Sequence, residues 1–269
     1  MKFSNYHQHT TFSDGKHSPE EVVMQAIELG VENLGFSDHL ATPYEISVGF
    51  NGITTNSYER YHAEIERLKK LYQGKIRLFC GVELDAFSQA NNQIYDYTIG
   101  SVHYLEYNGK TYPVDHNIKL QNEYLKEVCL GDLNKFAKDY YNQVFNCIQK
   151  FKPNIIGHFD VLNKFSLFDE NDRTYKKIAT ETLEKCLKIT PVLEMNTGAI
   201  SRGYKTYPYP ASFLLGALKE LNADIILSSD AHNKYNTIYF FEECVKILKV
   251  AGFKHIVKFT DNQFEKIEL

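Results

Sequence analysis

The 269-residue sequence has no tryptophan, no long hydrophobic run and only five cysteines. The cysteines are odd in number and widely scattered, without a Cys-x-x-Cys pair, which predicts reduced, buried thiols instead of a disulfide framework. The longest apolar runs stay far short of the ~20 residues that cross a bilayer. The first residues turn polar at once, unlike a signal peptide. Together these absences predict a cytoplasmic protein without a membrane partner.

A strongly basic character is also absent, since 30 Lys and Arg stand against 34 Asp and Glu and the formal net charge is −4. With no basic run, the sequence argues against a nucleic-acid partner. Hydrophobic residues at 43% and charged residues at 24% are ordinary for a globular protein. Because no repeat, low-complexity tract or Pro/Gly/Ser-rich linker interrupts the chain, residues 1–269 are predicted to form a single domain.

Short apolar segments alternate with amphipathic helical segments along the whole chain. The first helix, 18–30, is predicted from a capping box at Ser18 and Glu21, a proline at its first position and a glycine at its end. Further helices are expected at 57–72, 120–130, 133–151, 173–189, 210–221 and 236–250. Strands are expected at 3–7, 33–37, 76–83, 97–102, 155–157, 192–195 and 225–228, and an eighth, at 256–259, closes the chain. Apolar strands separated by helices indicate parallel βαβ units, so the sequence predicts an α/β barrel of seven units related to the (β/α)8 fold.

Two insertions interrupt this alternation of strands and helices. Residues 40–56 are rich in Pro, Gly, Tyr and Phe, and residues 104–115 are predicted to form a small hairpin that turns at Asn108-Gly109. Loops of this length beside a rigid scaffold are often lids or specificity elements.

The predicted strands deliver imidazoles and carboxylates at their C-terminal ends, where the active sites of α/β barrels assemble. In chain order these residues are His7, His9, Asp14, Asp38, His39, Glu83, His103, His158, Glu194, Asp230 and His232. Each one alone has an ordinary structural explanation, such as a helix cap or a core histidine bonded to a carbonyl. Their concurrence favours a functional site, because so many polar groups at one mouth would otherwise be costly to desolvate. The remaining histidines are predicted to be surface or packing residues: His17, His62, His116 and His255.

A mixed set of imidazoles and carboxylates is typical of Zn²⁺, Fe²⁺ or Mn²⁺ ligands, and the scarcity of thiols disfavours a zinc finger. About nine ligands are too many for one ion, so two or three ions that share a bridging carboxylate fit better. Such clusters activate water and hold a phosphoryl group for in-line displacement.

The same residues resemble the polymerase-and-histidinol-phosphatase (PHP) superfamily nearly from end to end. The matching segments are His7-Gln8-His9-Thr10, Ser13-Asp14-Gly15, Ser37-Asp38-His39, Gly81-Val82-Glu83, Ser101-Val102-His103, Gly157-His158, Glu194-Met195-Asn196 and Ser229-Asp230-Ala231-His232. The resemblance implies a distorted, TIM-like (β/α)7 barrel with three divalent metal ions at its C-terminal mouth. The implied ligands are His7, His9, Glu83 and Asp230 for the first ion, Glu83, His103 and His158 for the second, and Asp14, His39 and His232 for the third. Asp38 and Glu194 have a competing role, in which they orient their neighbours through hydrogen bonds.

Two further segments resemble the stand-alone histidinol-phosphate phosphatases of this superfamily. The first is Gly157-His158-Phe159-Asp160, and the second runs from Asn196 to Arg202 and is followed by Tyr207-Pro208-Tyr209-Pro210. The second resembles a segment that carries a phosphate-binding arginine. Arg202 is one of only five arginines in the chain, and its planar fork can bind a phosphate through two parallel hydrogen bonds. The alternative is an ordinary surface arginine.

The implied activity is hydrolysis of L-histidinol phosphate to L-histidinol and phosphate in histidine biosynthesis, by attack of a hydroxide that bridges two metals. Arg202 and the ions would neutralise the phosphoryl oxygens. The candidate catalytic carboxylates are Asp14, Asp160 and Asp230, of which Asp160 or Asp230 would assist departure of the alkoxide. The ammonium and imidazole of this substrate would favour carboxylate and aromatic neighbours, which the two insertions could supply. The alternatives are another PHP-type phosphoesterase that acts on nucleotides or other small phosphate esters, and a non-catalytic metal-binding module.

Overall fold

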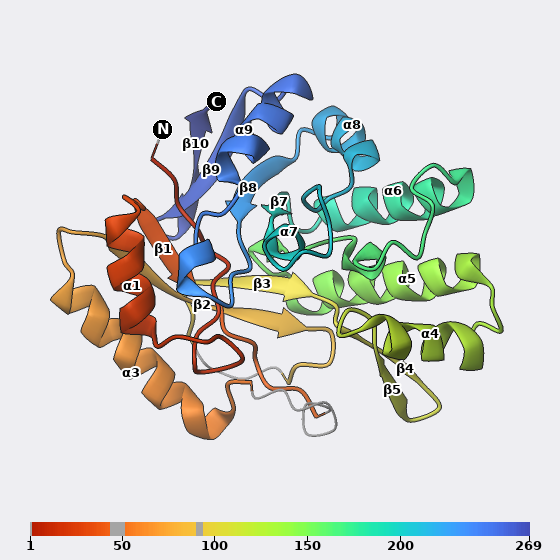
Figure 1. Ribbon diagram of the computed structural model, residues 1–269, viewed down its shortest axis with the longest axis horizontal. Helices are drawn as coiled ribbons and strands as arrows, with labels where there is room; N and C mark the ends of the chain where they lie inside the picture. Colours follow the sequence, from red (N-terminus) through yellow and green to blue (C-terminus); the bar gives the residue numbers. More distant parts are fainter. Residues whose placement is uncertain (1, 44–51, 90–93) are drawn as a thin grey trace.

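The computed structural model describes residues 2–43, 52–89 and 94–269. Its main element is a six-stranded parallel sheet (Figure 1), with the strand order β1-β2-β3-β6-β7-β8. The strands are β1 (Asn33–Phe36), β2 (Arg77–Asp85), β3 (Tyr97–Ser101), β6 (Ile155–Ile156), β7 (Val192–Asn196) and β8 (Asp224–Ser228). The α-helices are α1 (Pro19–Glu28), α3 (Thr55–Leu71), α4 (Ile118–Glu127), α5 (Leu133–Phe151), α6 (Arg173–Leu187), α7 (Gly198–Ser201), α8 (Ser212–Glu220) and α9 (Phe241–Val250). The structure thus confirms the predicted mixed α/β class.

Most predicted helices form close to their expected bounds, because residues with capping side chains precede them in the sequence. Ser18 and Glu21 make the predicted capping box of α1, and α5 spans the predicted residues 133–151, capped by the side chain of Asp132. The helix predicted from residue 236 begins later. Phe240 has a left-handed backbone (φ 66°), and a short 3₁₀ helix, η2 (Lys234–Asn236), precedes it, so α9 starts at Phe241.

The predicted first strand, 3–7, is not a strand of the sheet. It is an extended segment with isolated parallel bridges, from Asn5 to Leu34 in β1 and from Gln8 to Ala231 beyond β8. Backbone N–H groups of His9 and Ala231 donate across the second junction, to Ala231 O and His7 O. Because β1 and β8 are the two edges of the sheet, the sheet must curl for one segment to reach both. The structure therefore shows a curled six-stranded sheet in place of the seven continuous strands predicted.

The predicted last strand belongs to a separate sheet. Its observed form, β9 (His255–Thr260), pairs antiparallel with β10 (Gln263–Glu268), a strand that the sequence analysis missed. The side chains of β10 are mostly exposed, so this segment lacks the buried apolar run on which the strand predictions depended.

Tyr97 fills the interior of the curled sheet. Its hydroxyl donates to the backbone oxygen of Tyr6 (2.5 Å) and also lies 3.0 Å from the backbone oxygen of Phe36, so one O–H group is shared between two acceptors. A Cβ atom at Gly35 or Gly81 would collide with its ring or hydroxyl. Glycine on the two neighbouring strands is therefore required for the close approach of this ring. The surrounding buried cluster is completed by Phe79, Ile99, Ile155, Val192, Ile226, Val257 and Phe259.

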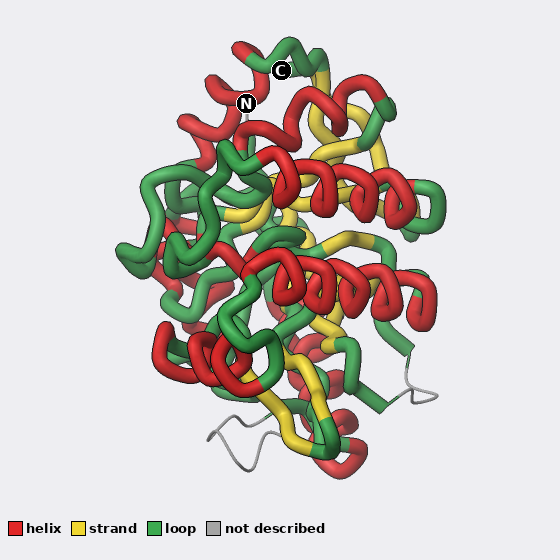
Figure 2. Tube along the Cα trace, turned by 90° about the vertical axis from the view of Figure 1, so that its right-hand side faces the viewer, coloured by secondary structure: helices red, strands yellow, loops and turns green. Residues whose placement is uncertain are grey.

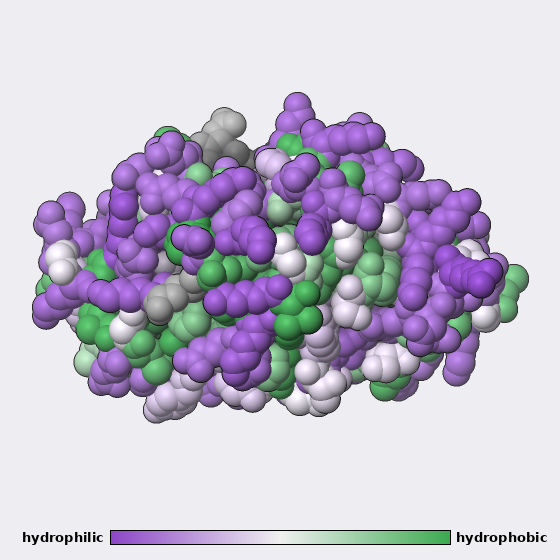
Figure 3. Space-filling model, turned by 90° about the horizontal axis from the view of Figure 1, so that it is seen from above, coloured by the Kyte–Doolittle hydropathy of each residue, from purple (hydrophilic) through white to green (hydrophobic). Residues whose placement is uncertain are grey.

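The helices pack outside the sheet (Figure 2), over two further buried clusters. On the face seen in Figure 3, hydrophilic side chains cover most of the surface, and hydrophobic ones show through in small areas. Within the described ranges, no helix combines the length and the apolar character that a membrane crossing demands. All five cysteines are buried and free, as predicted.

The predicted hairpin forms from β4 (Tyr104–Tyr107) and β5 (Lys110–Pro113). It turns at Asn108 and Gly109, which both have positive φ values, 50° and 76°, as a two-residue hairpin turn demands. Of the other insertion, residues 44–51 lie outside the described part. Leu40 and Ile53 on its two sides form an isolated bridge.

Candidate metal centre

The C-terminal ends of the parallel strands bring the predicted ligands together. His7 and His9 come from the extended N-terminal segment, His39 follows β1, Glu83 lies in β2 and His103 follows β3. The later ligands are His158, which follows β6, and Asp230 and His232, which follow β8. Parallel strands deliver the residues beyond their ends to one rim, so residues up to 225 positions apart become neighbours.

Four overlapping groups in this cluster have the geometry of a metal site, with one possible ligand atom per residue and all those atoms within 4.8 Å of one another. The groups are His9, Asp14, His39 and His232; His7, Glu83 and His158; His7, His9 and Asp230; and His39, Glu83 and His103. Every residue predicted as a ligand occurs in at least one group.

Glu83 lies at the centre of the cluster. Its Oε2 is 3.2 Å from His7 Nε2 and 3.0 Å from His39 Nδ1. Its Oε1 is 3.0 Å from His158 Nε2 and 3.4 Å from His103 Nε2. The two oxygens therefore face different pairs of imidazoles, which is the arrangement that a bridging carboxylate needs.

Several buried polar atoms at this centre have no hydrogen-bond partner among the residues that the structure describes. They include His7 Nε2, His9 Nε2 and Glu83 Oε2, which face one another. A buried polar atom without a partner is costly. A cation held between two imidazole nitrogens and a carboxylate oxygen would satisfy all three, so the donor set fits a divalent metal.

Glu194 and Asp38 make hydrogen bonds that orient neighbouring groups, which was the alternative to a direct role in metal binding. Glu194 Oε2 lies 2.8 Å from His7 Nδ1, which leaves Nε2 of that ring for the centre. Asp38 accepts hydrogen bonds from the backbone N–H of Thr10 (2.7 Å) and from the hydroxyl of Ser13 (2.6 Å). It thereby fixes the turn that carries the neighbouring candidate ligands His9 and Asp14.

The electrostatic surroundings differ between two neighbouring imidazoles of the cluster, His39 and His9. Burial by itself lowers the pKa of His39, but the carboxylates of Glu83 and Asp14 outweigh it and raise the pKa to about 10. Burial dominates at His9, whose pKa falls to about 3 with help from the neighbouring His232 and His39. His9 is thus a neutral imidazole, the form that ligates metals.

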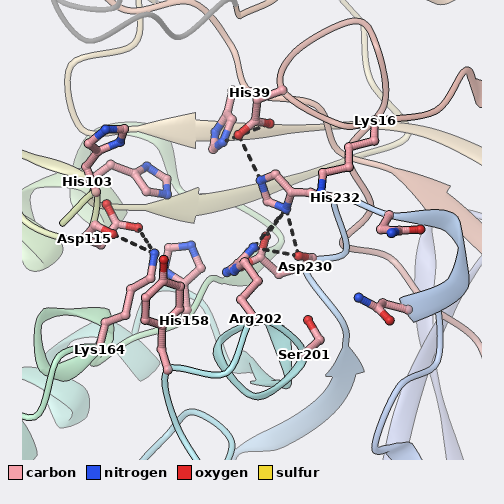
Figure 4. A pocket seen from close by; sticks show the side chains of 15 residues that line it. Lys16, His39, His103, Asp115, His158, Lys164, Ser201, Arg202, Asp230 and His232 are labelled. Carbon is pink, nitrogen blue, oxygen red and sulfur yellow. Dashed lines mark hydrogen bonds and ion pairs between the residues drawn. The ribbon is translucent and has the colours of Figure 1, made fainter.

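A cavity of about 510 Å³ opens above the cluster. Figure 4 shows Asp115 and Lys164 on one side of it, Lys16 and His232 on the other, and His158 and Arg202 between them. Arg202, predicted to bind phosphate, does line the cavity. It is not a free surface arginine, because its guanidinium donates to Asp230 Oδ2 at 2.9 Å and lies 2.9 Å from His232 Nδ1.

Asp160 is a predicted site residue that the structure places away from the cavity. It is fully buried and is not among the described residues that line the cavity. Its Oδ2 accepts a hydrogen bond from the backbone N–H of Ala211 at 2.8 Å, whereas its Oδ1 has no hydrogen-bond partner within residues 2–43, 52–89 and 94–269. Burial raises its pKa to about 6.

The sequence analysis did not single out several residues at or beside the site, among them the following four. Asp115, His116 and Lys164 line the cavity, although His116 was predicted to be a bystander. Asp85 accepts a hydrogen bond from the backbone N–H of His103 (2.7 Å). Position at the end of the predicted hairpin was the available signal for Asp115 and His116, but no spacing rule marked Lys164.

The comparisons with known proteins agree with this geometry. The family model described as the PHP domain matches residues 5–198, so the chain belongs to the PHP domain family. That match contains the first seven of the nine candidate ligands, from His7 to His158. Asp230 and His232 lie beyond it and are carried by the structural argument alone.

Among curated proteins, the chain is similar to a probable histidinol-phosphatase of Deinococcus radiodurans, with 27% identity over 87% of this chain and 88% of that protein. It is similar to the histidinol-phosphatase of Bacillus subtilis, with 24% identity over 90% of this chain and 98% of that protein. Among solved structures, histidinol phosphate phosphatase of Lactococcus lactis, crystallised with zinc, L-histidinol and phosphate, shares the fold with a TM-score of 0.74. That match has 23% identity and covers 98% of this chain and 99% of that one.

Proposed function

We propose that this protein is a metal-dependent phosphomonoesterase that hydrolyses L-histidinol phosphate to L-histidinol and phosphate in histidine biosynthesis. The observation that carries the proposal is a cluster of nine imidazole and carboxylate side chains with metal-site spacing, six of which line a cavity that Arg202 also lines. The names of the curated relatives and the L-histidinol and phosphate bound by the Lactococcus lactis enzyme support this substrate.

The proposed cofactors are three divalent ions, of zinc, iron or manganese. The ligands would be His7, His9, Glu83 and Asp230 for the first ion, Glu83, His103 and His158 for the second, and Asp14, His39 and His232 for the third. The ions would supply Lewis acidity toward the phosphoryl oxygens and a water of lowered pKa. Glu83 joins the first two sets, as the different partners of its two oxygens support.

The protein's own part is to hold the phosphate ester beside this centre. Arg202 Nη2 donates one of its two N–H groups to Asp230 Oδ2, and the side chain is 28% exposed. The guanidinium thus has a donor left for a phosphoryl oxygen, which a planar fork binds well. In this pose the negative charge that grows on the phosphoryl oxygens faces a fixed cation.

Departure of the alkoxide requires a proton. Two of the three candidate carboxylates, Asp14 and Asp230, line the cavity, and the network of charges around each lowers its pKa despite burial. The third, Asp160, lies behind the cavity wall, where it can act on the leaving group only through an intermediary. Because Asp14 and Asp230 are held ionised, we favour as the source of this proton a water that one of them orients.

The proposal extends to the architecture. The bridges that the 5–8 segment makes to β1 and to Ala231 support a distorted (β/α)7 barrel that this segment closes, and residues 1–269 would form one domain.

The decisive experiment measures bound metal and then compares turnover of L-histidinol phosphate, nucleotides and p-nitrophenyl phosphate before and after chelation. We expect metal-dependent phosphate release, with L-histidinol phosphate preferred. Absence of phosphate release from all three by metal-replete protein would refute the enzymatic function. A strong preference for nucleotides would refute only the substrate.

A further inference from the structure

The cavity wall opposite Lys16 carries a carboxylate that no metal group uses. Of the described residues lining the cavity, three have carboxylates: Asp14, Asp115 and Asp230. Asp14 and Asp230 belong to the metal groups. Asp115 is therefore the carboxylate on this wall that remains available for a ligand.

The main chain around Asp115 is fixed before any ligand arrives. The N–H of Val114 donates to the backbone oxygen of His103 (2.9 Å), and Gln121 donates to the backbone oxygen of Val114 (2.9 Å). Lys164 Nζ donates to the backbone oxygen of Asp115 at 2.6 Å. A carboxylate held on a segment anchored from both sides loses little entropy on binding a ligand.

The carboxylate itself is only partly neutralised. Lys164 Nζ is 3.4 Å from Oδ2, a longer contact than its bond to the backbone oxygen, and Oδ1 has no partner among the described residues. Burial would raise the pKa of Asp115, but Lys164, His103, His158 and Arg202 outweigh it and lower the pKa. The side chain retains 19% exposure, so an ionised oxygen faces the cavity.

We propose that Asp115 is a specificity residue that binds a primary ammonium group carried close to the phosphate ester. The site is then selective for aminoalkyl phosphates over neutral alkyl phosphates. The inference rests on the proposed phosphatase function and assigns to one residue the recognition of the substrate's second charge. The bound aminoalkyl phosphate would place its phosphate at Arg202, beside the metal centre, and its ammonium group at Asp115, on the opposite wall. A nucleotide lacks an ammonium at this place and gains nothing from the carboxylate.

The test compares L-histidinol phosphate with 3-(imidazol-4-yl)propyl phosphate, which differs only by replacement of the amino group by hydrogen. In the Asp115→Asn variant, the ratio of kcat/KM between the amine and the amine-free substrate should fall roughly ten- to a hundredfold, since hydrogen bonds to charged groups have this strength. The fall should lie mainly in KM for the amine. The control is Glu127→Gln, which removes an exposed carboxylate at the end of α4 that pairs with Lys110 of β5. This variant should leave the ratio unchanged.

A second readout does not depend on turnover. Titration of L-histidinol into metal-loaded protein with inorganic phosphate present should show at least tenfold weaker binding in Asp115→Asn, at unchanged metal content. Equal losses on both substrates, or no loss on either, would overturn the specificity role. If the phosphatase function itself is wrong, the wild-type protein will hydrolyse neither substrate. That result would refute both proposals, whereas the variant results above refute only the role of Asp115.

Discussion

The carboxylate of Asp230 and the guanidinium of Arg202 are joined by a hydrogen bond of 2.9 Å between Oδ2 and Nη2. Asp230 also faces the metal centre, with its Oδ1 3.2 Å from His9 Nε2. One carboxylate therefore links the arginine proposed for phosphate to the ligands proposed for metal. Asp230 does so from a left-handed backbone (φ 46°), a conformation that Asp tolerates better than most residues and that is often found at functional sites.

Replacement of Arg202 tests its role in phosphate binding. Because lysine keeps the charge but loses the planar fork, Arg202→Lys should raise KM for L-histidinol phosphate roughly tenfold or more, with a smaller change in kcat. Inhibition by inorganic phosphate should weaken in parallel. Arg173→Lys, at the exposed start of α6, is the matched control. Unchanged KM and unchanged phosphate inhibition would show that Arg202 serves only to hold Asp230.

Gly198 offers a test of the Arg202–Asp230 geometry without removal of either side chain. A Cβ atom at this position would lie 2.7 Å from Asp230 Oδ2 and 2.9 Å from Arg202 Nη2. Gly198→Ala should therefore push the pair apart and lower kcat/KM at least tenfold, at a cost of about 1–3 kcal/mol in folding stability. Gly216→Ala is the control, since nothing lies within 4 Å of its Cβ in α8. That control should gain about 0.5–1 kcal/mol and retain its kinetics.

Loss of a ligand should lower the amount of bound metal. His158→Ala and Asp230→Ala each remove a member of a candidate metal group, so each should lose at least one ion per chain relative to wild type. The measurement is elemental analysis of protein purified under identical conditions. His62→Ala replaces a histidine of α3 outside these groups and should keep the full content. Equal metal content in all four proteins would contradict the ligand assignment.

Chelation should destabilise the wild-type fold. A ligand present at a hundredfold over its dissociation constant stabilises the folded state by about 3 kcal/mol. Removal of one such ion should therefore lower Tm by roughly 5–10 °C for a chain of this size. The shift should be smaller in His158→Ala, which already lacks a ligand. Differential scanning calorimetry with and without chelator gives the comparison, and an identical Tm in both conditions would argue against metal bound at the centre.

Asp160 provides a prediction about pH. Its pKa is raised to about 6 in the folded state from an ordinary 3.8, so the folded state binds this proton more tightly than the unfolded state does. The associated stability is fully present below about pH 4 and is lost as the pH rises through 6. Asp160→Asn can keep the hydrogen bond from Ala211 without the buried charge. The variant should match wild type near pH 4 and exceed it by up to about 3 kcal/mol at pH 8.

The same variant separates two roles of Asp160. If its carboxyl only supports the wall, kcat in Asp160→Asn should stay within a few-fold of wild type. A fall in kcat of a hundredfold or more, without loss of metal, would reinstate it as the acid that assists the leaving group. Urea denaturation across the pH range and steady-state kinetics on the same preparations provide both readouts.

The convergence of the candidate ligands on one rim was predictable because most of them sit at or just beyond the end of a predicted apolar strand. Glu83 and His103 could be placed on one rim before any coordinates, since parallel strands share a direction. Asp115 and Lys164 could not be paired in this way. Their contact depends on how the β4–β5 hairpin folds back toward the segment after β6, and neither has a periodic pattern that encodes this approach.

The pairing of strands at the sheet edges was the other feature that could not be predicted from the sequence. Residues 3–7 were predicted to form a short apolar strand, but in the described structure the segment makes isolated bridges at Asn5 and, just beyond the predicted strand, at Gln8. The reason is that it passes between two sheet edges that lie far apart in the chain. The polar strand β10 was missed because periodicity marks burial on one face, and β10 is held by its backbone pairing with β9.

The segment that carries His7 and His9 has a consequence for biosynthesis. A ribosome makes His7 long before it makes His232, 225 residues later, yet both belong to groups that share His9. A nascent chain therefore exposes metal-binding fragments well before the complete centre can assemble. The complete set of proposed ligands exists only after residue 232 has been made, so metal loading of the whole centre would be a late event in folding.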